Sequence, residues 1–388
     1  MIIGIGKEIK KDESRVGLTP KKVKILIENN HTVLVEKDAG ILSSFSNEDY
    51  INVGARIVEK PELYSKAELI IKVKNLFPEE VNLLSENQII FTYLPLDENA
   101  TPQFSKNLTK TKVNIIAYEW VCDKGVYVLL KPMSELTGLI SAQRSLEILT
   151  GKKGIIGGGY ITPIKAPQII VIGVGIIGAN AINVYLRNNC KIKIFDKHPQ
   201  TVEKRLTNYI PEEIINYHKN NIQILQSSEA NWHETQSDLK KHLLNTDILI
   251  NCAVRRPTMP KENCNYLITK TMINLMPKNG VVIDATARNK DIIETAVSSP
   301  KLHHIYKKED QWHYNCNHIP ALVPITATKM LTEATFPYIL QTANKGFIKA
   351  VKENKALLAG VVCAKGKMVH KYTCDKKKLK YTNIKEML

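Results

Sequence analysis

A glycine-rich turn carries the clearest chemical signal in this sequence. The stretch Gln168–Leu186 contains Gly173, Gly175 and Gly178 in the spacing G-x-G-x-x-G, between an apolar strand pattern and a helical pattern. Glycine at these positions permits a tight turn, a close approach of the backbone to a pyrophosphate, and close packing of helix on strand. The N-terminus of the following helix would offer free N–H groups and partial positive charge to the phosphates. The sequence therefore predicts a dinucleotide-binding site here.

The end of the next strand pattern indicates which dinucleotide binds. Lys191–Phe195 has the pattern of a strand, and Asp196 follows it, 23 residues after Gly173. A carboxylate there can accept hydrogen bonds from both ribose hydroxyls and would repel a 2′-phosphate, which favours NAD over NADP. Lys197 and His198 follow directly and weaken that preference. The alternative, a glycine-rich turn in an ordinary sheet, leaves the strand-end acid unexplained.

The elements that must position these residues follow an alternating pattern. Strand patterns early in the chain are Met1–Ile5, Thr32–Val35, Leu69–Val73, Gln88–Leu94 and Val113–Tyr118, and helix patterns between them are Pro20–Asn29, Asn47–Val53 and Pro78–Leu84. A helix pattern at Met133–Thr150 and a Gly-rich connection precede a second series, with strand patterns at Ile169–Gly173, Lys191–Phe195, Asp247–Asn251 and Val281–Asp284. Thr326–Asn344 is the clearest helix pattern after these. Such alternation is typical of parallel sheets covered by helices on both faces.

We therefore predict an α/β fold with two Rossmann-like, doubly wound parallel-sheet domains and a cleft between them. A length of 388 residues suits two or three domains. Residues 133–307 would form the NAD-binding domain as an insertion. Residues 1–132 and 308–388 would form a discontinuous substrate domain.

The net charge bears on whether the protein binds nucleic acid or a membrane surface. The chain has 54 Lys and Arg against 38 Asp and Glu, a net charge of +16, which invites a nucleic-acid or membrane-surface interpretation. No basic stripe with interleaved aromatics is present, and aromatics make up only 6%, which argues against nucleic acid. Residues 365–388 contribute a net +6. We expect this tail to be a solvated extension, with an anionic partner as the minority alternative.

The cysteines and the N-terminus bear on compartment and metal. Seven cysteines without a C-x-x-C pair fit the reduced thiols of a cytoplasmic protein better than disulfides or a zinc site. Cys316 and His318 alone offer too few ligands, so we expect no metal. The N-terminus becomes charged too early for a signal peptide. No uninterrupted apolar stretch is long enough to span a membrane.

Several segments, taken in order, resemble the alanine dehydrogenase family, which shares ancestry with the NAD-binding subunit of proton-translocating transhydrogenase. They are IGIGKEIKKDESRVGLTP, IIKVKNLFPEE, FTYLPL, AYEWV, PMSELTGLISAQ, KGIIGGG and ATFPYILQTANKG, together with the nucleotide motif. The resemblance runs to about Val351. It implies NAD as the cofactor, oxidation of L-alanine to pyruvate and ammonium, and a homo-oligomer, which is a hexamer in many relatives.

The resemblance also implies which residues bind substrate. Arg15 matches the family's carboxylate-binding arginine, whose fork geometry suits a carboxylate. Lys74 matches the lysine that contacts the substrate carboxylate and carbonyl, and it lies at the end of an apolar strand pattern, where α/β sheets place ligands. The alternative is that both residues are solvated surface charges, as most arginines and lysines are. Ser134, Val254 and Asn317 complete the set of residues that we expect to bind the cofactor.

Two catalytic positions depart from the family. Its histidine within FTYLHL is Pro95 here, and proline has neither a titratable group nor an N–H donor. Its catalytic aspartate, four residues beyond the strand-end Asp284, is Arg288 here. His318, in the loop NCNHIPALVP, is a candidate to supply an imidazole, and Glu119, in AYEWV, is a weaker candidate.

Three explanations of these departures stay open. The first is an alanine dehydrogenase with substitute groups. The second is a changed substrate, since Arg15, Lys74 and Arg288 could accept a second carboxylate, as in opine- or saccharopine-type secondary-amine dehydrogenases. The third is a catalytically impaired NAD-binding module. We favour an NAD-dependent amino-acid oxidoreductase, because a module that binds only nucleotide has no need of Arg15 or Lys74.

Overall fold

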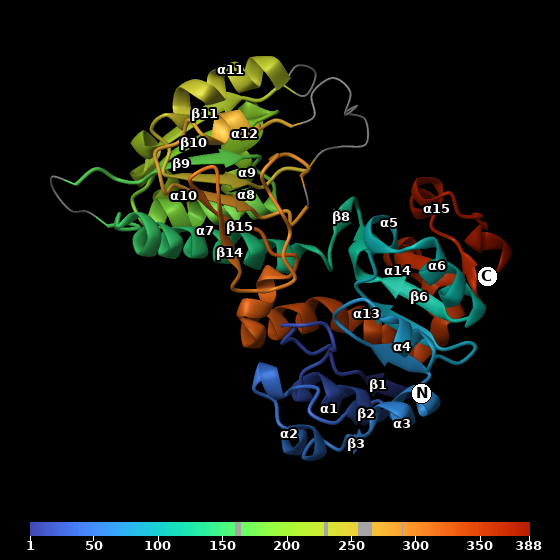
Figure 1. The fold of residues 1–388 in the computed structure, drawn as a ribbon. Coiled ribbons are helices and arrows are strands. Elements are labelled where there is room, and N and C mark those ends of the chain that lie inside the picture. Colours follow the sequence, from blue (N-terminus) through green and yellow to red (C-terminus); the bar gives the residue numbers. More distant parts are fainter. Residues whose placement is uncertain (160–163, 229–231, 255–265, 289) are drawn as a thin grey trace. The chain divides into compact units, whose positions relative to one another are not determined.

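The structure, a computed structural model, describes residues 1–159, 164–228, 232–254, 266–288 and 290–388. The chain forms two compact units, Met1–Met133 with Val323–Leu388, and Ser134–Leu322. Each unit is an α/β layered structure around a mainly parallel sheet (Figure 1), which confirms the predicted fold class.

The first unit is built on an eight-stranded sheet in the order β17-β16-β6-β5-β4-β1-β2-β3. Its parallel strands are β1 (Ile2–Ile5), β2 (Thr32–Glu36), β3 (Arg56–Val58), β4 (Leu69–Ile71), β5 (Ile89–Thr92) and β6 (Asn114–Ala117). β16 (Val361–Ala364) and β17 (Lys367–Met368) extend it in antiparallel pairing. From β3 to β6 this is the doubly wound strand order, whose switch point lies between β1 and β4.

Helices and short apolar strands bury the core of this first unit. The helices are α1 (Pro20–Glu28), α2 (Asn47–Ile51), α3 (Lys60–Lys66), α4 (Pro78–Val81), α5 (Leu96–Asn99), α6 (Pro102–Lys110), α13 (Pro324–Glu353), α14 (Lys355–Gly360) and α15 (Lys371–Lys377). Proline begins several of them, where its missing N–H has no helical partner to lose. The core includes Leu63, Ile70, Ile90, Leu108 and Ile115. A small two-stranded sheet, β7 (Cys122–Asp123) with β8 (Val126–Tyr127), stands apart from the main one.

The second unit is built on a seven-stranded sheet in the order β11-β10-β9-β12-β13-β15-β14. The strands are β9 (Gln168–Ile172), β10 (Lys191–Asp196), β11 (Ile222–Gln226), β12 (Ile248–Asn251), β13 (Val281–Asp284), β15 (Gln311–Tyr314) and β14 (Ile305–Lys308). All pair in parallel except β14. The strand order again reverses beside the first strand, so the switch point lies between β9 and β12.

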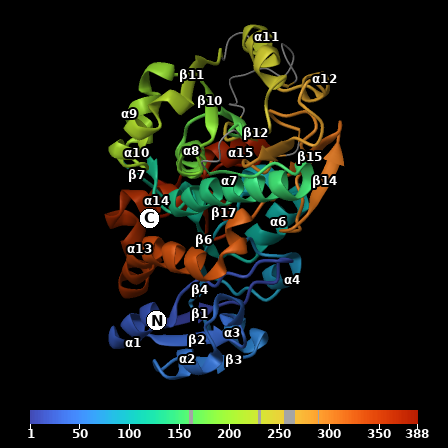
Figure 2. The same cartoon turned by 90° about the vertical axis from the view of Figure 1, so that its left-hand side faces the viewer.

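The helices of this second unit are α7 (Lys131–Lys153), whose first residues belong to the first unit, α8 (Ile176–Arg187), α9 (Val202–Leu206), α10 (Glu212–Tyr217), α11 (Trp232–Leu243) and α12 (Lys270–Ile273). α7 and α8 lie side by side in both views (Figure 1, Figure 2), and a Cβ atom on Gly138 would stand only 2.2 Å from the Ile177 carbonyl oxygen. Short 3-10 turns occur at Ile41–Ser43, Tyr118–Trp120, Pro199–Thr201, Lys219–Asn221, Ile319–Leu322 and Ile384–Glu386.

The second boundary between the units lies later than residue 307. β15 pairs in parallel with β13, and β14 pairs with β15, so this hairpin completes the second sheet. Residues 308–322, which we expected in the discontinuous substrate domain, therefore belong to the second unit.

The Lys-rich C-terminal segment is packed onto the first unit. Lys376 Nζ lies 3.0 Å from Asp97 Oδ2, and Lys377 Nζ donates to the Ala100 carbonyl at 3.1 Å. Cys374 is buried, and Leu379 packs against the core. The expectation of a solvated extension is therefore wrong for this helix, α15, which contacts α5. Among the described helices, none is long and apolar enough to cross a membrane.

Candidate functional site

The carboxyl ends of β1 and β4 define a ligand position in the first unit, because open α/β sheets bind ligands at the switch point. Glu8 follows β1, and one of its carboxylate oxygens accepts the Val73 backbone N–H, just beyond β4, at 2.6 Å. Arg15 comes from the segment after β1 and Lys74 from the segment after β4. The sheet topology therefore brings two of the predicted substrate residues to one edge.

Arg15 is buried and held in one orientation. Its Nε and Nη2 each donate to the Glu13 carboxylate at 2.6 Å, and Nη1 contacts Met133 Sδ at 3.1 Å. Burial opposes the charge, but the attraction and hydrogen bonds of Glu13 outweigh it, so the pKa of Arg15 is raised and the group stays protonated. Within the described part of the chain these contacts leave one N–H on Nη1 and one on Nη2 for a ligand carboxylate.

Lys74 is half-buried beside these charges. Burial, and after it the positive charges of Arg15 and Lys10, lower the pKa of its ammonium group to about 7. Its Nζ lies 5.8 Å from the centre of the Tyr93 ring. The Tyr93 hydroxyl donates to the Leu129 carbonyl at 2.6 Å, which fixes the ring. Lys74 can therefore exist as a cation or as a neutral amine near neutral pH.

Glu119 lies against Leu94, next to Pro95, the position where the resemblance led us to expect a histidine. Both carboxylate oxygens lie 3.1 Å from the Leu94 backbone nitrogen. Burial raises the pKa of this carboxyl to about 8; nearby Asp97 raises it too, whereas the Leu94 N–H and Lys74 oppose the shift. A carboxyl group that keeps its proton near neutrality can donate or accept one in a reaction.

Pro95 itself occupies a tight turn. Its φ of −72° and ψ of 69° are those of the central residue of an inverse γ-turn, and the Leu96 N–H donates to the Leu94 carbonyl at 2.7 Å. The pyrrolidine ring holds φ near this value, and the turn requires no N–H from the central residue. The backbone at this position is therefore one that other residue types can also adopt.

One buried lysine of the same edge escaped the sequence analysis. Lys72 is fully buried and forms ion pairs with Glu80 and, at 3.7 Å, with Glu8. The Tyr64 hydroxyl donates to Glu80 at 2.9 Å and completes the network. The run IIKVK offers two lysines with no local sign of which one faces the core. The acidic partner at position 80, in the next helix, is the signal that distinguishes them.

The glycine-rich loop of the second unit has room for phosphate where the motif requires it. Gly173 follows β9 with a φ of 84°, and a Cβ atom on Gly178 would lie 2.1 Å from the Gly173 carbonyl oxygen. A Cβ atom on Gly175 would meet no atom of the described residues within 4 Å. Since α8 starts at Ile176, its first N–H groups lie next to that open space. These residues fit a dinucleotide pyrophosphate.

Asp196 ends β10 and is nearly fully buried. Its carboxylate accepts the backbone N–H groups of Val174 at 2.7 Å and His198 at 2.8 Å. It also pairs with Arg205 at 2.7 Å. Burial by itself would raise the pKa of Asp196, but the hydrogen bonds of Arg205 and the two N–H groups lower it overall. Asp196 is therefore ionised, and through Val174 it shapes the loop between Gly173 and Gly175.

The remaining predicted residues lie elsewhere in the second unit. Asp284 ends β13, accepts Asn251 Nδ2 at 3.0 Å and the Thr286 hydroxyl at 2.7 Å, and burial raises its pKa to about 6. Arg288 accepts a hydrogen bond from Asn315 through its carbonyl, at 3.3 Å.

His318 is buried among its sequence neighbours. Its Nδ1 lies 2.8 Å from Asn317 Oδ1 and 3.5 Å from Cys316 Sγ. Ser134 lies half-buried in α7, and Val254 is exposed beyond the end of β12. The structure therefore brings Arg15, Lys74 and Glu119 together in one unit, and the nucleotide residues in the other.

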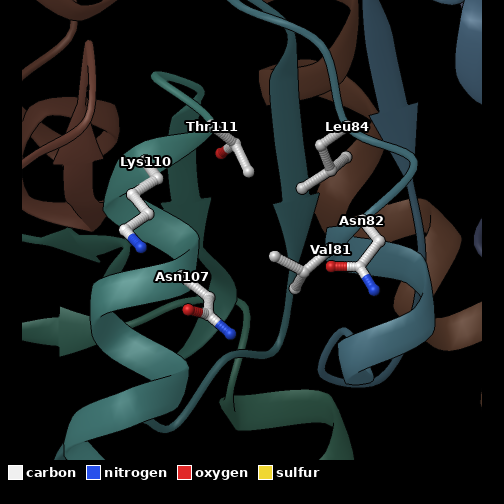
Figure 3. A pocket seen from close by; sticks show the side chains of 6 residues that line it. All are labelled: Val81, Asn82, Leu84, Asn107, Lys110 and Thr111. Carbon is white, nitrogen blue, oxygen red and sulfur yellow. The ribbon is translucent and has the colours of Figure 1, made fainter.

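A cavity of about 290 Å³ lies on the first unit at α4 and α6 (Figure 3). It is lined by Val81, Asn82, Leu84, Asn107, Lys110 and Thr111. None of the predicted site residues lines it.

Two doubly wound units, one with a glycine-rich loop between β9 and α8 and the other with Arg15 and Lys74 at its switch point, define a two-domain α/β protein of the kind that suits a dinucleotide. Residues 4–137 match the N-terminal domain of the alanine dehydrogenase/PNT family, and residues 139–371 match its C-terminal domain. The chain belongs to this family.

Individual relatives agree over the full length. The chain is 34% identical to an alanine dehydrogenase of Methanococcus maripaludis, with 100% of both chains covered. It is 35% identical to an alanine dehydrogenase of Bacillus subtilis, over 95% of this chain and 93% of the relative. The match thus continues past Val351, where we expected it to end.

Solved structures give the same result. An L-alanine dehydrogenase structure superimposes with a TM-score of 0.82 at 28% identity, over 97% of this chain and 99% of that chain. A transhydrogenase from Sinorhizobium meliloti has a TM-score of 0.74 at 19% identity, covering 95% of this chain and 99% of that one, and this likeness concerns the fold alone.

Proposed function

We propose that this alanine-dehydrogenase-like oxidoreductase interconverts L-alanine with pyruvate and ammonium, using NAD. The observation that carries the proposal is that a rigidly held Arg15 and a half-buried Lys74 lie at the same sheet switch point. A protein that only bound nucleotide would gain nothing from burying these two cations, because burying charge costs free energy. The relatives at 34–35% identity, which are alanine dehydrogenases, support the same substrate.

Residues of the second unit would hold the cofactor. The open backbone at Gly175 and the start of α8 suit the pyrophosphate, and Asp196 holds the loop in shape through Val174. When bound, NAD supplies an acceptor for the hydride that leaves the amino-acid α-carbon. Ser134, Val254 and Asn317 remain proposals for further cofactor contacts.

The substrate carboxylate would bind to Arg15. Among the described residues, the contacts of the guanidinium with Glu13 and Met133 leave two of its N–H groups, and a guanidinium binds carboxylates through such paired donors. In its charged form Lys74 would add a second positive charge to the carboxylate and carbonyl oxygens. Both groups bind and orient the substrate.

Proton transfer would fall to Lys74 and Glu119 in place of the absent imidazole. Lys74 has a pKa of about 7 and Glu119 a pKa of about 8, so each exchanges a proton near neutral pH. Both lie next to the Tyr93–Pro95 segment, where the family places its histidine. His318 stays the second candidate for this role.

The test is a screen of NADH consumption across 2-oxo acids, each tried with ammonium and separately with amino acids as amine donors. We expect pyruvate with ammonium to be turned over, and this activity to be lost in Arg15→Met. Arg56→Met, which changes an exposed arginine of β3, is the matched control. Dependence on amino-acid donors would instead indicate an opine-type enzyme. No turnover with any pair would contradict the proposal.

Binding tests the cofactor separately from the chemistry. We expect Asp196→Ala to weaken NAD affinity in calorimetry, because the Val174 and His198 N–H groups lose their acceptor. Unchanged affinity would overturn the assignment of Asp196. An oligomer and a cytoplasmic location remain predictions from the family resemblance.

A further inference from the structure

The carboxylate expected to recognise the cofactor ribose is already saturated with donors. Asp196 Oδ1 accepts from the His198 N–H at 2.8 Å and Arg205 Nη2 at 2.7 Å, and Oδ2 accepts from the Val174 N–H at 2.7 Å and Arg205 Nη1 at 3.2 Å. A carboxylate offers about four lone-pair positions, so these four hydrogen bonds fill it. Arg205 holds two of these four positions, which is the number that the two hydroxyls of a ribose would need.

Arg205 lies in α9 and joins the two loops of the nucleotide site. It donates to the carbonyl of Val174, within the glycine-rich loop, and at 3.1 Å to the carbonyl of His198, beyond β10. Its side chain remains 32% exposed although it pairs with a buried carboxylate. The guanidinium therefore stands at the surface of the site and can exchange a protein partner for a ligand.

The ion pair changes the charge that a nucleotide meets. A strand-end carboxylate rejects a 2′-phosphate by repulsion between like charges, and pairing with a guanidinium cancels most of that repulsion. Lys197 follows Asp196 directly, and Lys204 is exposed beside Arg205. Guanidinium groups also bind phosphate through paired donors.

We propose that Arg205 determines nucleotide specificity in this protein, so that the site accepts dinucleotides with an adenosine 2′-phosphate as well as NAD. The proposal rests on the proposed nucleotide site and extends it to NADP. Asp196 alone would favour NAD over NADP. With Arg205 paired to it, the site is nearly neutral in charge and this preference is lost. Freed from Arg205, Asp196 would regain two acceptor positions for the ribose hydroxyls and its repulsion of a phosphate.

The test is calorimetric titration of the full chain with NAD and with NADP, at one salt concentration. We expect the two dissociation constants of the wild type to agree within about tenfold. In Arg205→Leu, NADP affinity should fall by about tenfold or more, while NAD affinity is kept or improved. Arg187→Leu is the matched control, since this exposed arginine of α8 bonds Asn183 away from the site.

Each outcome decides between the two proposals. NAD binding with rejection of NADP by more than about 100-fold in the wild type, or an unchanged ratio in Arg205→Leu, would overturn the role of Arg205 alone. Binding of neither nucleotide would overturn the nucleotide site as well. If circular dichroism shows that Arg205→Leu does not fold, the ratio of the NAD and NADP dissociation constants of the wild type decides. Arg205→Lys should then give a ratio between those expected for the wild type and for a site without the cation.

Discussion

At the scale of single residues, proline at position 95 fits the turn in which it lies. Pro95 satisfies a turn whose central residue needs only a φ near −70°, and the neighbouring Leu94 N–H binds Glu119. A histidine could therefore adopt the same backbone angles at this position. The Glu119 carboxyl contacts the residue directly before Pro95. General acid–base groups contribute roughly 10²–10⁴-fold to enzymatic rates, so their loss slows chemistry rather than abolishing it.

The first prediction restores the family residues. Wild type should turn over alanine slowly, and Pro95→His combined with Arg288→Asp should raise kcat, by about tenfold or more if the imidazole recovers part of an acid–base contribution. Steady-state kinetics of NAD reduction with L-alanine measures this. Pro102→His, at the start of α6, controls for a change of proline to histidine outside the site. Wild-type turnover at ordinary family rates would contradict the importance of the two departures.

The second prediction concerns the cost of burying Lys74. Below pH 7 this lysine is charged in both the folded and the unfolded state, and the folded state bears the full cost of burial. Between pH 7 and its ordinary value of 10.5 the folded state loses its proton first, so that cost disappears as pH rises.

Lys74→Met should therefore raise the free energy of unfolding at pH 6, by on the order of 1 kcal/mol, with a smaller gain at pH 10. Urea denaturation at the two pH values measures the difference. Lys66→Met, at the exposed last residue of α3, is the control for a lysine-to-methionine change at the surface. A larger gain at pH 10 than at pH 6 would show that burial does not lower this pKa.

At the scale of elements, the contact of α7 with α8 depends on one glycine. A Cβ atom on Gly138 would stand 2.2 Å from the Ile177 carbonyl oxygen and 2.8 Å from Asn180 Cβ. Both are closer than any real contact, and the nearest atom belongs to backbone that cannot rotate away. Since α8 begins at the glycine-rich loop, this packing also sets where the loop lies relative to α7.

The third prediction uses two glycines of the same helix. Gly138→Ala should destabilise the protein by about 2–4 kcal/mol, because an overpacked contact forces the helices apart. Gly151→Ala is the matched control: it is exposed in the last turn of α7, and its Cβ would meet nothing within 4 Å among the described residues. It should stabilise by about 0.5–1 kcal/mol through helix propensity. Equal effects in thermal denaturation would show that α7 and α8 do not pack as described.

At the scale of the whole molecule, each unit has a hydrophobic core of its own. One core gathers residues such as Ile70, Ile90 and Ile115, and the other gathers Ile170, Leu249 and Val282. Separate cores allow separate unfolding transitions. The chain crosses between the units at residues 133–134 and 322–323.

The fourth prediction follows from these two cores and the proposed cofactor site. Urea unfolding should show two transitions, and NAD should stabilise only that of residues 134–322, by about 2.7 kcal/mol at a concentration 100 times its dissociation constant. Hydrogen exchange followed by mass spectrometry assigns each transition to its peptides. Adenosine at the same concentration, which lacks the pyrophosphate, is the control. A single cooperative transition would mean that the units do not unfold independently.

Local patterns were sufficient for much of this molecule. The glycine spacing, the apolar strand before it and the acid at the end of β10 are set by residues near one another in the chain, and the structure has the strand and helix where the pattern predicts them. The two α/β units likewise followed from alternation alone. Short or half-polar strands were not predicted from the sequence: β3 has three residues, and β11 has the sequence IQILQ and is only partly buried.

Other features depend on partners far away in the sequence. Lys72 and Lys74 have similar local surroundings, yet Glu80 and Glu8 pair with the first and leave the second half-buried. The lysine-rich α15 is held on the first unit by its packing against α5. The hairpin β14–β15 belongs to the second unit because β15 pairs with β13.

The sequence by itself thus determined the family, the fold class and the place of the glycine-rich loop, because glycine conformation and apolar periodicity act over a few residues. Only the tertiary structure showed that Arg205 saturates Asp196, nine residues away on another element, and that Glu119 lies against the Leu94 N–H. Charge and hydrogen bonding act through space, so which carboxylate remains available to a ligand is decided by folding.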